Sequence, residues 1–296
     1  MYFRYQGVRG QGEKIRRSSR GGLILVQDTV KKNSALKRHL TAVVALPVFI
    51  AYVYYLPPFP YFLGFIIVAG MIAMRELFNM YRVPAGLNAA SVAVGGFLIY
   101  IFCQYPEHTL QGILFSVTAL ILHRMFWAKT PSGSMSDLGP VGIGFLYIVI
   151  CMSFFWSLRD MENGLAYTFV LYASVWLADS MAYYIGSNMG RHKLCPSISP
   201  GKTIEGAVGS VIGGILGVVI IKYLFGISNL SAGCAVLTGA VMGVTTLIGD
   251  LIESMFKRDA GVKDSGTLMP GHGGMFDRID GMLISGPVLY FIVRYF

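Results

Sequence analysis

EGAVGSVIGGILGVVIIKYLF, residues 205–225, carries no charged residue between Glu205 and Lys222. A helix of roughly 20 mostly apolar residues crosses the hydrocarbon core of a bilayer, so this stretch predicts a transmembrane helix. The chain contains eight further apolar runs, some of them short: about 40–56, 60–74, 88–102, 110–126, 141–158, 165–187, 231–249 and 281–295. The sequence therefore predicts an all-α, polytopic integral membrane protein with about nine transmembrane helices.

The composition supports the same class of protein. Hydrophobic residues make up 54% of the 296 residues and charged residues only 13%, whereas a soluble domain usually has about 25% charged residues. No small-residue cleavage site follows the first apolar run, so no secretory signal peptide is predicted. The four cysteines form no CxxC pair and no metal-binding spacing, which argues against a disulfide framework or a zinc site.

We divide the chain into a basic N-terminal arm (1–39), N-terminal transmembrane helices (40–160) and a C-terminal transmembrane catalytic region (161–296) with polar loops at 188–204 and 250–280. The first 40 residues hold ten Lys or Arg residues and two acidic ones. Such an arm either attracts anionic lipid headgroups or is only an orientation signal or a partly non-native leader. No recognition module follows it, so nucleic-acid binding is not expected.

The distribution of positive charge predicts the orientation in the membrane. With a cytoplasmic N-terminus, 21 of the 24 Lys and Arg residues lie in cytoplasmic segments and three lie in outer segments: Arg159, Lys222 and Arg294. Cytoplasmic loops of membrane proteins carry such an excess of Lys and Arg. We therefore expect a multi-pass protein of the cell inner membrane, with loops 188–204 and 250–280 both facing the cytoplasm.

Two features within the apolar runs stand out. Gly209, Gly213 and Gly217 recur every fourth residue, a spacing that lets helix backbones approach closely, either within the chain or across a dimer interface. Asp179 lies inside the run 165–187. Because a charge there is costly, it indicates a functional acid or a structural partner for a cation on another helix.

The first polar loop combines cations and hydroxyls just before a predicted helix start. Its candidates for binding phosphate oxygens are Arg191, Lys193, Ser199, Lys202 and Thr203. A helix N-terminus offers free backbone N–H groups and the positive end of the helix dipole, and Lys and Arg are strong donors to phosphate. The alternative is an ordinary basic cytoplasmic loop.

The second polar stretch, 249–280, reads GDLIESMFKRDAGVKDSGTLMPGHGGMFDRID. Its six carboxylates are Asp250, Glu253, Asp259, Asp264, Asp277 and Asp280. Carboxylates with few histidines suit Mg²⁺, which keeps coordination positions for phosphate and water. Metal and cations together suit phosphoryl or nucleotidyl transfer. His272 is interpreted as a ligand, an acid or base, or a turn residue, and a solvated amphipathic loop is the alternative for the whole stretch.

These residues resemble the signature of the phosphatidate cytidylyltransferase family, the CDP-diacylglycerol synthases. The matching positions are Ser254, Lys257, Arg258, Lys263, Asp264, Pro270, Gly271, His272, Gly273, Gly274, Asp277, Arg278 and Asp280. Upstream, WLADSMAY (176–183) and SPGKTIEG (199–206) are also similar to the family. Gly281 stands where family members often have Ser, so no hydroxyl role is expected there.

The resemblance implies that CTP and phosphatidic acid react to give CDP-diacylglycerol and pyrophosphate, with Mg²⁺ required and a monovalent cation such as K⁺ as a further candidate. It also implies a homodimer. We expect catalytic roles for Asp250, Asp277, Lys263, Asp264, Lys257 and Arg258. The expected metal ligands are Asp250, Asp277, Asp179, Asp280 and Glu253. The expected substrate-binding residues are Lys202, Thr203, Ser199, Arg191, Lys193, Arg278, His272, Gly273, Gly274 and Ser254.

Two other classes of membrane protein are alternatives. A membrane transporter with an intramembrane acidic site is the alternative function, but transporters bind near the bilayer midplane, whereas most charges here lie in loops. The CDP-alcohol phosphotransferases are also membrane enzymes, but their Asp-Gly-x-x-Ala-Arg hallmark is missing.

Overall fold

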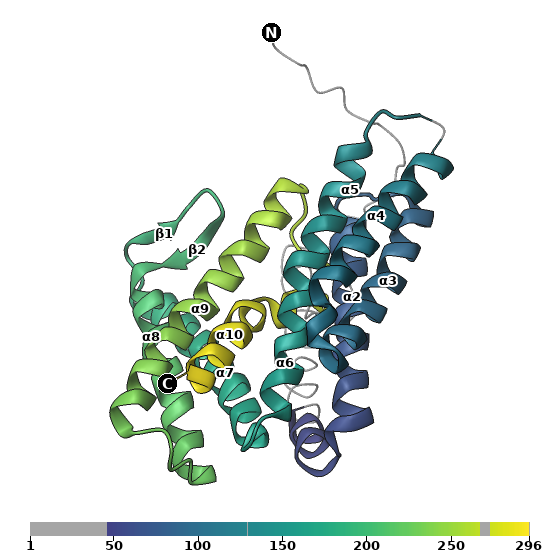
Figure 1. The fold of residues 1–296 in the computed structure, drawn as a ribbon. Coiled ribbons are helices and arrows are strands. Elements are labelled where there is room, and N and C mark those ends of the chain that lie inside the picture. The colour runs from purple at the N-terminus through teal and green to yellow at the C-terminus, as the bar shows by residue number, and fades with distance from the viewer. Residues whose placement is uncertain (1–45, 129, 267–272, 296) are drawn as a thin grey trace, which may run out of the picture. The chain divides into compact units, whose positions relative to one another are not determined.

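The computed structural model describes residues 46–128, 130–266 and 273–295, which form helices and one small β hairpin (Figure 1). After an apolar helix at Leu46–Tyr55, the elements are η1 (Pro58–Phe62), α2 (Leu63–Met80), α3 (Ala85–Gln104), η2 (Pro106–His108), α4 (Thr109–Trp127), α5 (Ser134–Ile143), η3 (Gly144–Val149), α6 (Ile150–Asp160), α7 (Gly164–Met189), β1 (Lys193–Cys195), β2 (Ser199–Thr203), α8 (Ile204–Phe225), α9 (Ala232–Asp259) and α10 (Phe276–Tyr295).

The helices confirm the all-α, polytopic membrane class. Seven helical stretches among the described residues are long and apolar enough to span a bilayer: Pro58–Met80, Ala85–Gln104, Pro106–Trp127, Ser134–Asp160, Gly164–Met189, Ile204–Phe225 and Ala232–Asp259. The count of nine is not confirmed. The described part of the first predicted span is short, and α10 carries Asp277, Arg278, Asp280 and Arg294.

The glycines of α8 are used for packing inside the chain. Gly213 lies against the carbonyl group of Leu177, and Gly217 lies against the backbone of Ser174, so neither position has room for a Cβ. Both contacts are with α7. Of the two interpretations of this glycine spacing, the structure supports close packing within the chain, and the stripe is therefore not a free dimer face.

A second close approach joins α9 to α10. Gly249 lies directly against the backbone of Asp280 and Gly281, which leaves no room for a side chain. One helix turn earlier on α9, the hydroxyl of Thr245 is 2.9 Å from that of Ser285. These contacts bring the carboxylates of the two helices toward each other.

The β1–β2 hairpin and the C-terminal end of α9 lie at the same end of the helices, together with the C-terminal end of α4 and the start of α5 (Figure 1). The loop predicted at 188–204 contains the antiparallel β1–β2 hairpin, in which Lys193 pairs with Thr203. The stretch predicted as loop 250–280 begins inside α9, which continues to Asp259. The connection between α9 and α10 is therefore limited to residues 260–275.

Candidate active site

Lys257 lies between two carboxylates that come from different helices. Its ammonium group forms an ion pair with Glu253 one turn earlier on α9, and it is 2.7 Å from Asp277 Oδ1 on α10. The side chains of Glu253, Lys257 and Asp277 are only 2%, 13% and 10% exposed. An ion pair this buried interacts strongly because little water screens it. Glu253 and Lys257 are one turn apart and therefore lie on the same face of α9.

The second oxygen of Asp277 is also hydrogen-bonded. Oδ2 accepts bonds from the backbone N–H groups of Ser265 (3.1 Å) and Gly274 (2.8 Å), and from the hydroxyl of Ser265 (2.8 Å). Ser265 precedes residues 267–272 and Gly274 follows them. Asp277 therefore draws the two sides of the α9–α10 connection together.

Glu76 of α2 belongs to the same cluster, although it lies far away in the sequence. Its carboxylate accepts hydrogen bonds from the backbone N–H groups of Met275 (3.0 Å) and Phe276 (2.8 Å) and from the hydroxyl of Ser265 (3.2 Å). Sequence reasoning missed this residue. The predicted apolar run 60–74 ended before Glu76, whereas α2 continues to Met80, so no sequence signal marked Glu76 as an acid within a membrane helix.

A second contact joins α2 to the same region. The hydroxyl of Tyr81, just after α2, donates a 2.9 Å hydrogen bond to Asp259 at the end of α9. Burial, followed by this bond to Asp259, raises the pKa of Tyr81 to about 12. The N-terminal helices therefore hold both ends of the α9–α10 connection.

An adjoining cluster contains Asp250, Lys202 and two further acids. Lys202 of β2 forms an ion pair with Asp250 of α9. Asp179 of α7 is influenced by the charges of Asp250, Lys202 and Arg278. Asp280 of α10, whose backbone lies against Gly249 next to Asp250, is repelled by the like charges of Asp250 and Glu253. The structure thus brings together predicted residues from α7, β2, α9 and α10.

Asp250 and Asp277 belong to these two neighbouring clusters and have different cationic partners, Lys202 and Lys257. Glu253 connects the clusters, because it contacts Lys257 and also interacts with Asp280. Its second oxygen, Oε1, is buried and has no hydrogen-bond partner within the described part of the chain. An unpartnered buried carboxylate oxygen is costly unless a further group satisfies it.

Among residues 46–128, 130–266 and 273–295, no group of three Asp, Glu, His or Cys side chains has the arrangement of a complete metal site. Mg²⁺, however, typically binds one or two carboxylates and completes its shell with water and phosphate. The unpartnered oxygen of Glu253 and the nearby carboxylates of Asp250, Asp179 and Asp280 fit this requirement.

Arg258 and Thr203 have local partners that sequence reasoning did not anticipate. The guanidinium group of Arg258 donates to the carbonyls of Ile198 (3.2 Å) and Val262 (3.3 Å), which fastens the hairpin to the end of α9. The hydroxyl of Thr203 accepts a bond from Gly206 N–H and caps the first turn of α8. In this structure Thr203 is thus a helix cap, and Arg258 anchors the hairpin.

The remaining predicted residues differ in exposure. The side chains of Arg191, Lys193, Lys263 and Asp264 are exposed, and those of Ser199 and Ser254 are half-buried. Gly273 adopts a left-handed conformation with φ +79°, and Gly274 lies against the carboxylate of Glu76. His272 is outside the described residues.

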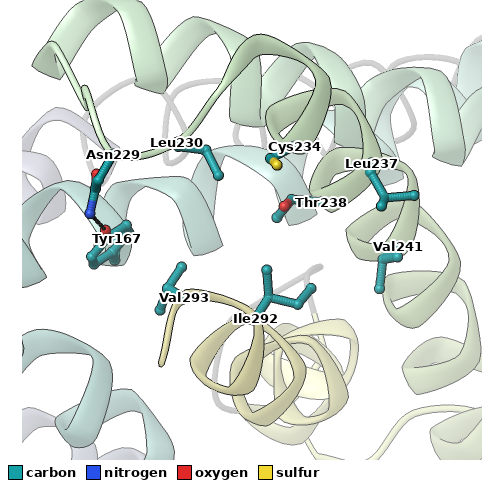
Figure 2. A pocket seen from close by; sticks show the side chains of 9 residues that line it. All are labelled: Tyr167, Asn229, Leu230, Cys234, Leu237, Thr238, Val241, Ile292 and Val293. Atoms are coloured by element: carbon teal, nitrogen blue, oxygen red, sulfur yellow. Dashed lines mark hydrogen bonds between the residues drawn. The ribbon is translucent and has the colours of Figure 1, made fainter. Parts of the chain in front are cut away.

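A separate cavity of about 270 Å³ lies at the opposite end of α9 (Figure 2). It is lined by Tyr167, Asn229, Leu230, Cys234, Leu237, Thr238, Val241, Ile292 and Val293. Its lining holds no charged side chain, and its polar contact is a 2.9 Å hydrogen bond from Asn229 to the Tyr167 hydroxyl. This cavity therefore lacks the groups that phosphate chemistry requires.

Comparison with known proteins gives a consistent result. A sequence model of the cytidylyltransferase family matches residues 36–296. Phosphatidate cytidylyltransferase of Bacillus subtilis (strain 168) is 33% identical over 243 residues, covering 77% of this chain and 86% of that protein. The proteins of the same name from Staphylococcus saprophyticus and Staphylococcus haemolyticus are each 34% identical, over 267 and 273 residues, with 85% of this chain and 96% of the relative covered.

Proposed function

The chain belongs to the cytidylyltransferase family, and from that premise we propose that it is a phosphatidate cytidylyltransferase. It transfers the cytidylyl group of CTP to phosphatidic acid, giving CDP-diacylglycerol and pyrophosphate, a step of phospholipid biosynthesis. Relatives of that name match most of the chain, in agreement with the resemblance seen in the sequence.

The observation that carries the proposal is the convergence of charged groups from β2, α9 and α10 near one end of the membrane helices. Lys202 and Asp250 pair between β2 and α9, and Lys257 and Asp277 pair between α9 and α10. A lipid phosphate and a water-soluble nucleotide can meet at the surface of the membrane. A site for their reaction needs cations for phosphate oxygens and carboxylates for a metal, and both are present here.

In the proposed reaction, a phosphate oxygen of phosphatidic acid attacks the α-phosphorus of CTP. The new phosphorus–oxygen bond forms as the bond to the bridging oxygen of the β-phosphate breaks, and pyrophosphate leaves. The residues assist by positioning and by charge stabilisation, the main sources of catalysis in such transfers. Lys202 and Lys257, whose side chains are half-buried, are the candidates to exchange a carboxylate partner for a phosphate oxygen. The exposed candidates are Arg191, Lys193, Lys263 and Arg278.

From the carboxylates Asp250, Asp179, Asp280 and Glu253, we expect one or two to bind Mg²⁺, with water and phosphate oxygens completing its coordination. Asp277 remains a candidate metal ligand. If Lys257 moved its ion pair from Asp277 to a substrate phosphate, Oδ1 of Asp277 would become available to the metal. When bound, the metal would neutralise the negative charge of the departing pyrophosphate. Sites for a monovalent cation such as K⁺ and roles for His272 and Asp264 remain predictions.

We further propose that this end of the protein faces the cytoplasm, with the chain in the cell inner membrane. The bias of Lys and Arg toward the loops at this end supports the orientation. The homodimer rests on the resemblance alone, because the glycine stripe of α8 is used within the chain.

The decisive experiment measures pyrophosphate release by the purified protein in detergent micelles. Release from CTP should require both added phosphatidic acid and Mg²⁺, and CDP-diacylglycerol should form in equal amount. CTP consumption with diacylglycerol or an alcohol in place of phosphatidic acid would contradict the proposal. Absence of turnover together with substrate uptake into vesicles would favour the transporter alternative.

A further inference from the structure

We propose that Glu76 is a positioning residue of the active site, acting from α2 on the start of α10 and through it on Asp277. The inference rests on the proposed function, because Asp277 is assigned there to the site. It extends the catalytic unit beyond the C-terminal region, to a helix about 200 residues away in the sequence.

The hydrogen bonds of Glu76 reach the first residues of α10. Its Oε1 accepts from Met275 N–H at 3.0 Å, and its Oε2 accepts from Phe276 N–H at 2.8 Å. The first N–H groups of a helix have no acceptor within that helix, and a negative charge near them interacts favourably with the helix dipole. Glu76 of α2 thus caps the first turn of α10, immediately before Asp277.

Ser265 connects the two carboxylates. Its hydroxyl is 3.2 Å from Glu76 Oε2 and 2.8 Å from Asp277 Oδ2. Ser265 is buried, as is Glu76, which is 8% exposed. A shift of Glu76 would therefore move Ser265 and Phe276 together, and these two residues flank the position of Asp277.

The space around Glu76 is filled to contact distance. A Cβ at Gly266 or Gly274 would collide with its carboxylate, so both glycines permit the close approach of the chain. The carboxylate of Glu76 accepts three hydrogen bonds from the α9–α10 connection and the start of α10, and these bonds couple the position of Glu76 to that connection.

The test compares Glu76→Ala and Glu76→Gln with Asn88→Ala. Asn88 is also buried and polar, but its amide donates to Asn79 of α2 at 2.8 Å rather than to α10. The full-length protein is studied by amide hydrogen exchange over residues 273–280 and by steady-state kinetics per folded molecule. The Gln variant keeps the shape of the side chain and one acceptor oxygen, so it carries the test if the Ala variant does not fold.

We expect Glu76→Ala to speed exchange at Met275 and Phe276 about tenfold, and to lower kcat about tenfold with a smaller change in the KM for CTP. Glu76→Gln should give intermediate values for both. Asn88→Ala should lower the melting temperature without changing either readout. Unchanged exchange in the Glu76 variants would overturn the contact, and faster exchange with normal kcat would overturn the positioning role. The exchange result does not depend on turnover, so it remains decisive if the proposed reaction is wrong.

Discussion

Lys257 of α9 donates to Asp277 of α10 across 2.7 Å, in surroundings that leave both side chains largely buried. This ion pair fixes the relative position of the two helices that carry most of the predicted site. Lys257 also contacts Glu253, so loss of one carboxylate leaves the other as its partner.

Asp277→Asn should therefore lower kcat by about 100-fold or more while the protein still folds. The amide keeps an acceptor for Ser265 and Gly274 but removes the charge that attracts Lys257 and any metal. Turnover is measured as phosphatidate-dependent pyrophosphate release, and folding by size exclusion and thermal melting. Asp160→Asn is the matched control, because Asp160 is exposed at the end of α6. Near-normal turnover by Asp277→Asn would remove this residue from the catalytic set.

Lys202 and Asp250 should respond differently to substitution. Lys202→Ala should raise the KM for a substrate about tenfold, because one phosphate donor is lost. Asp250→Asn should instead abolish turnover, because it removes one of the carboxylates, with Asp179 and Asp280, that are proposed to bind Mg²⁺. Full titrations of CTP and of phosphatidic acid separate the two effects. Kinetics of Lys202→Ala indistinguishable from wild type would place Lys202 outside the site.

Arg258 provides a test of hairpin anchoring. Its guanidinium reaches the carbonyl groups of Ile198 and Val262 at once, a geometry that a Lys ammonium does not reproduce. Both Arg258→Ala and Arg258→Lys should make residues 193–203 more susceptible to limited proteolysis and raise the KM for CTP several-fold. If Arg258→Lys retained wild-type protection of the hairpin, a simple charge contact with substrate would explain Arg258 better.

Mg²⁺ removal tests the assignment of Glu253. Chelation should abolish turnover, and added Mg²⁺ should restore it. Glu253→Gln should raise the Mg²⁺ concentration for half-maximal activity about tenfold, since the unpartnered Oε1 is the oxygen expected to face the ion. An unchanged Mg²⁺ requirement in this variant would assign Glu253 only to the ion pair with Lys257.

The apolar runs predicted the helices well because the length of a spanning helix is set by bilayer thickness. Contacts one turn apart, such as Glu253 with Lys257, were also within reach of the sequence. The contacts of Glu76 could not be predicted from the sequence, because its partners lie about 200 positions away and neither helix periodicity nor motif spacing indicates such a contact. Likewise, the choice between packing within the chain and a dimer interface for the glycines of α8 depended on the position of α7, which no local sequence pattern specifies.

The orientation of the site can be tested with single cysteines. Ser197 lies exposed in the hairpin, and Ser228 lies exposed in the connection between α8 and α9, at the other end of these helices. In a background in which the native Cys195 and Cys234 are replaced by Ser, Ser228→Cys should react with a membrane-impermeant maleimide in intact spheroplasts. Ser197→Cys should react only in inverted vesicles or after permeabilisation, because the Lys and Arg bias places the hairpin in the cytoplasm. The background protein keeps only Cys103 and Cys151, which are buried. It should therefore stay unlabelled, and its signal gives the baseline. Labelling of Ser197→Cys in intact cells would reverse the orientation and separate the site from cytoplasmic CTP, which would be incompatible with the proposed reaction.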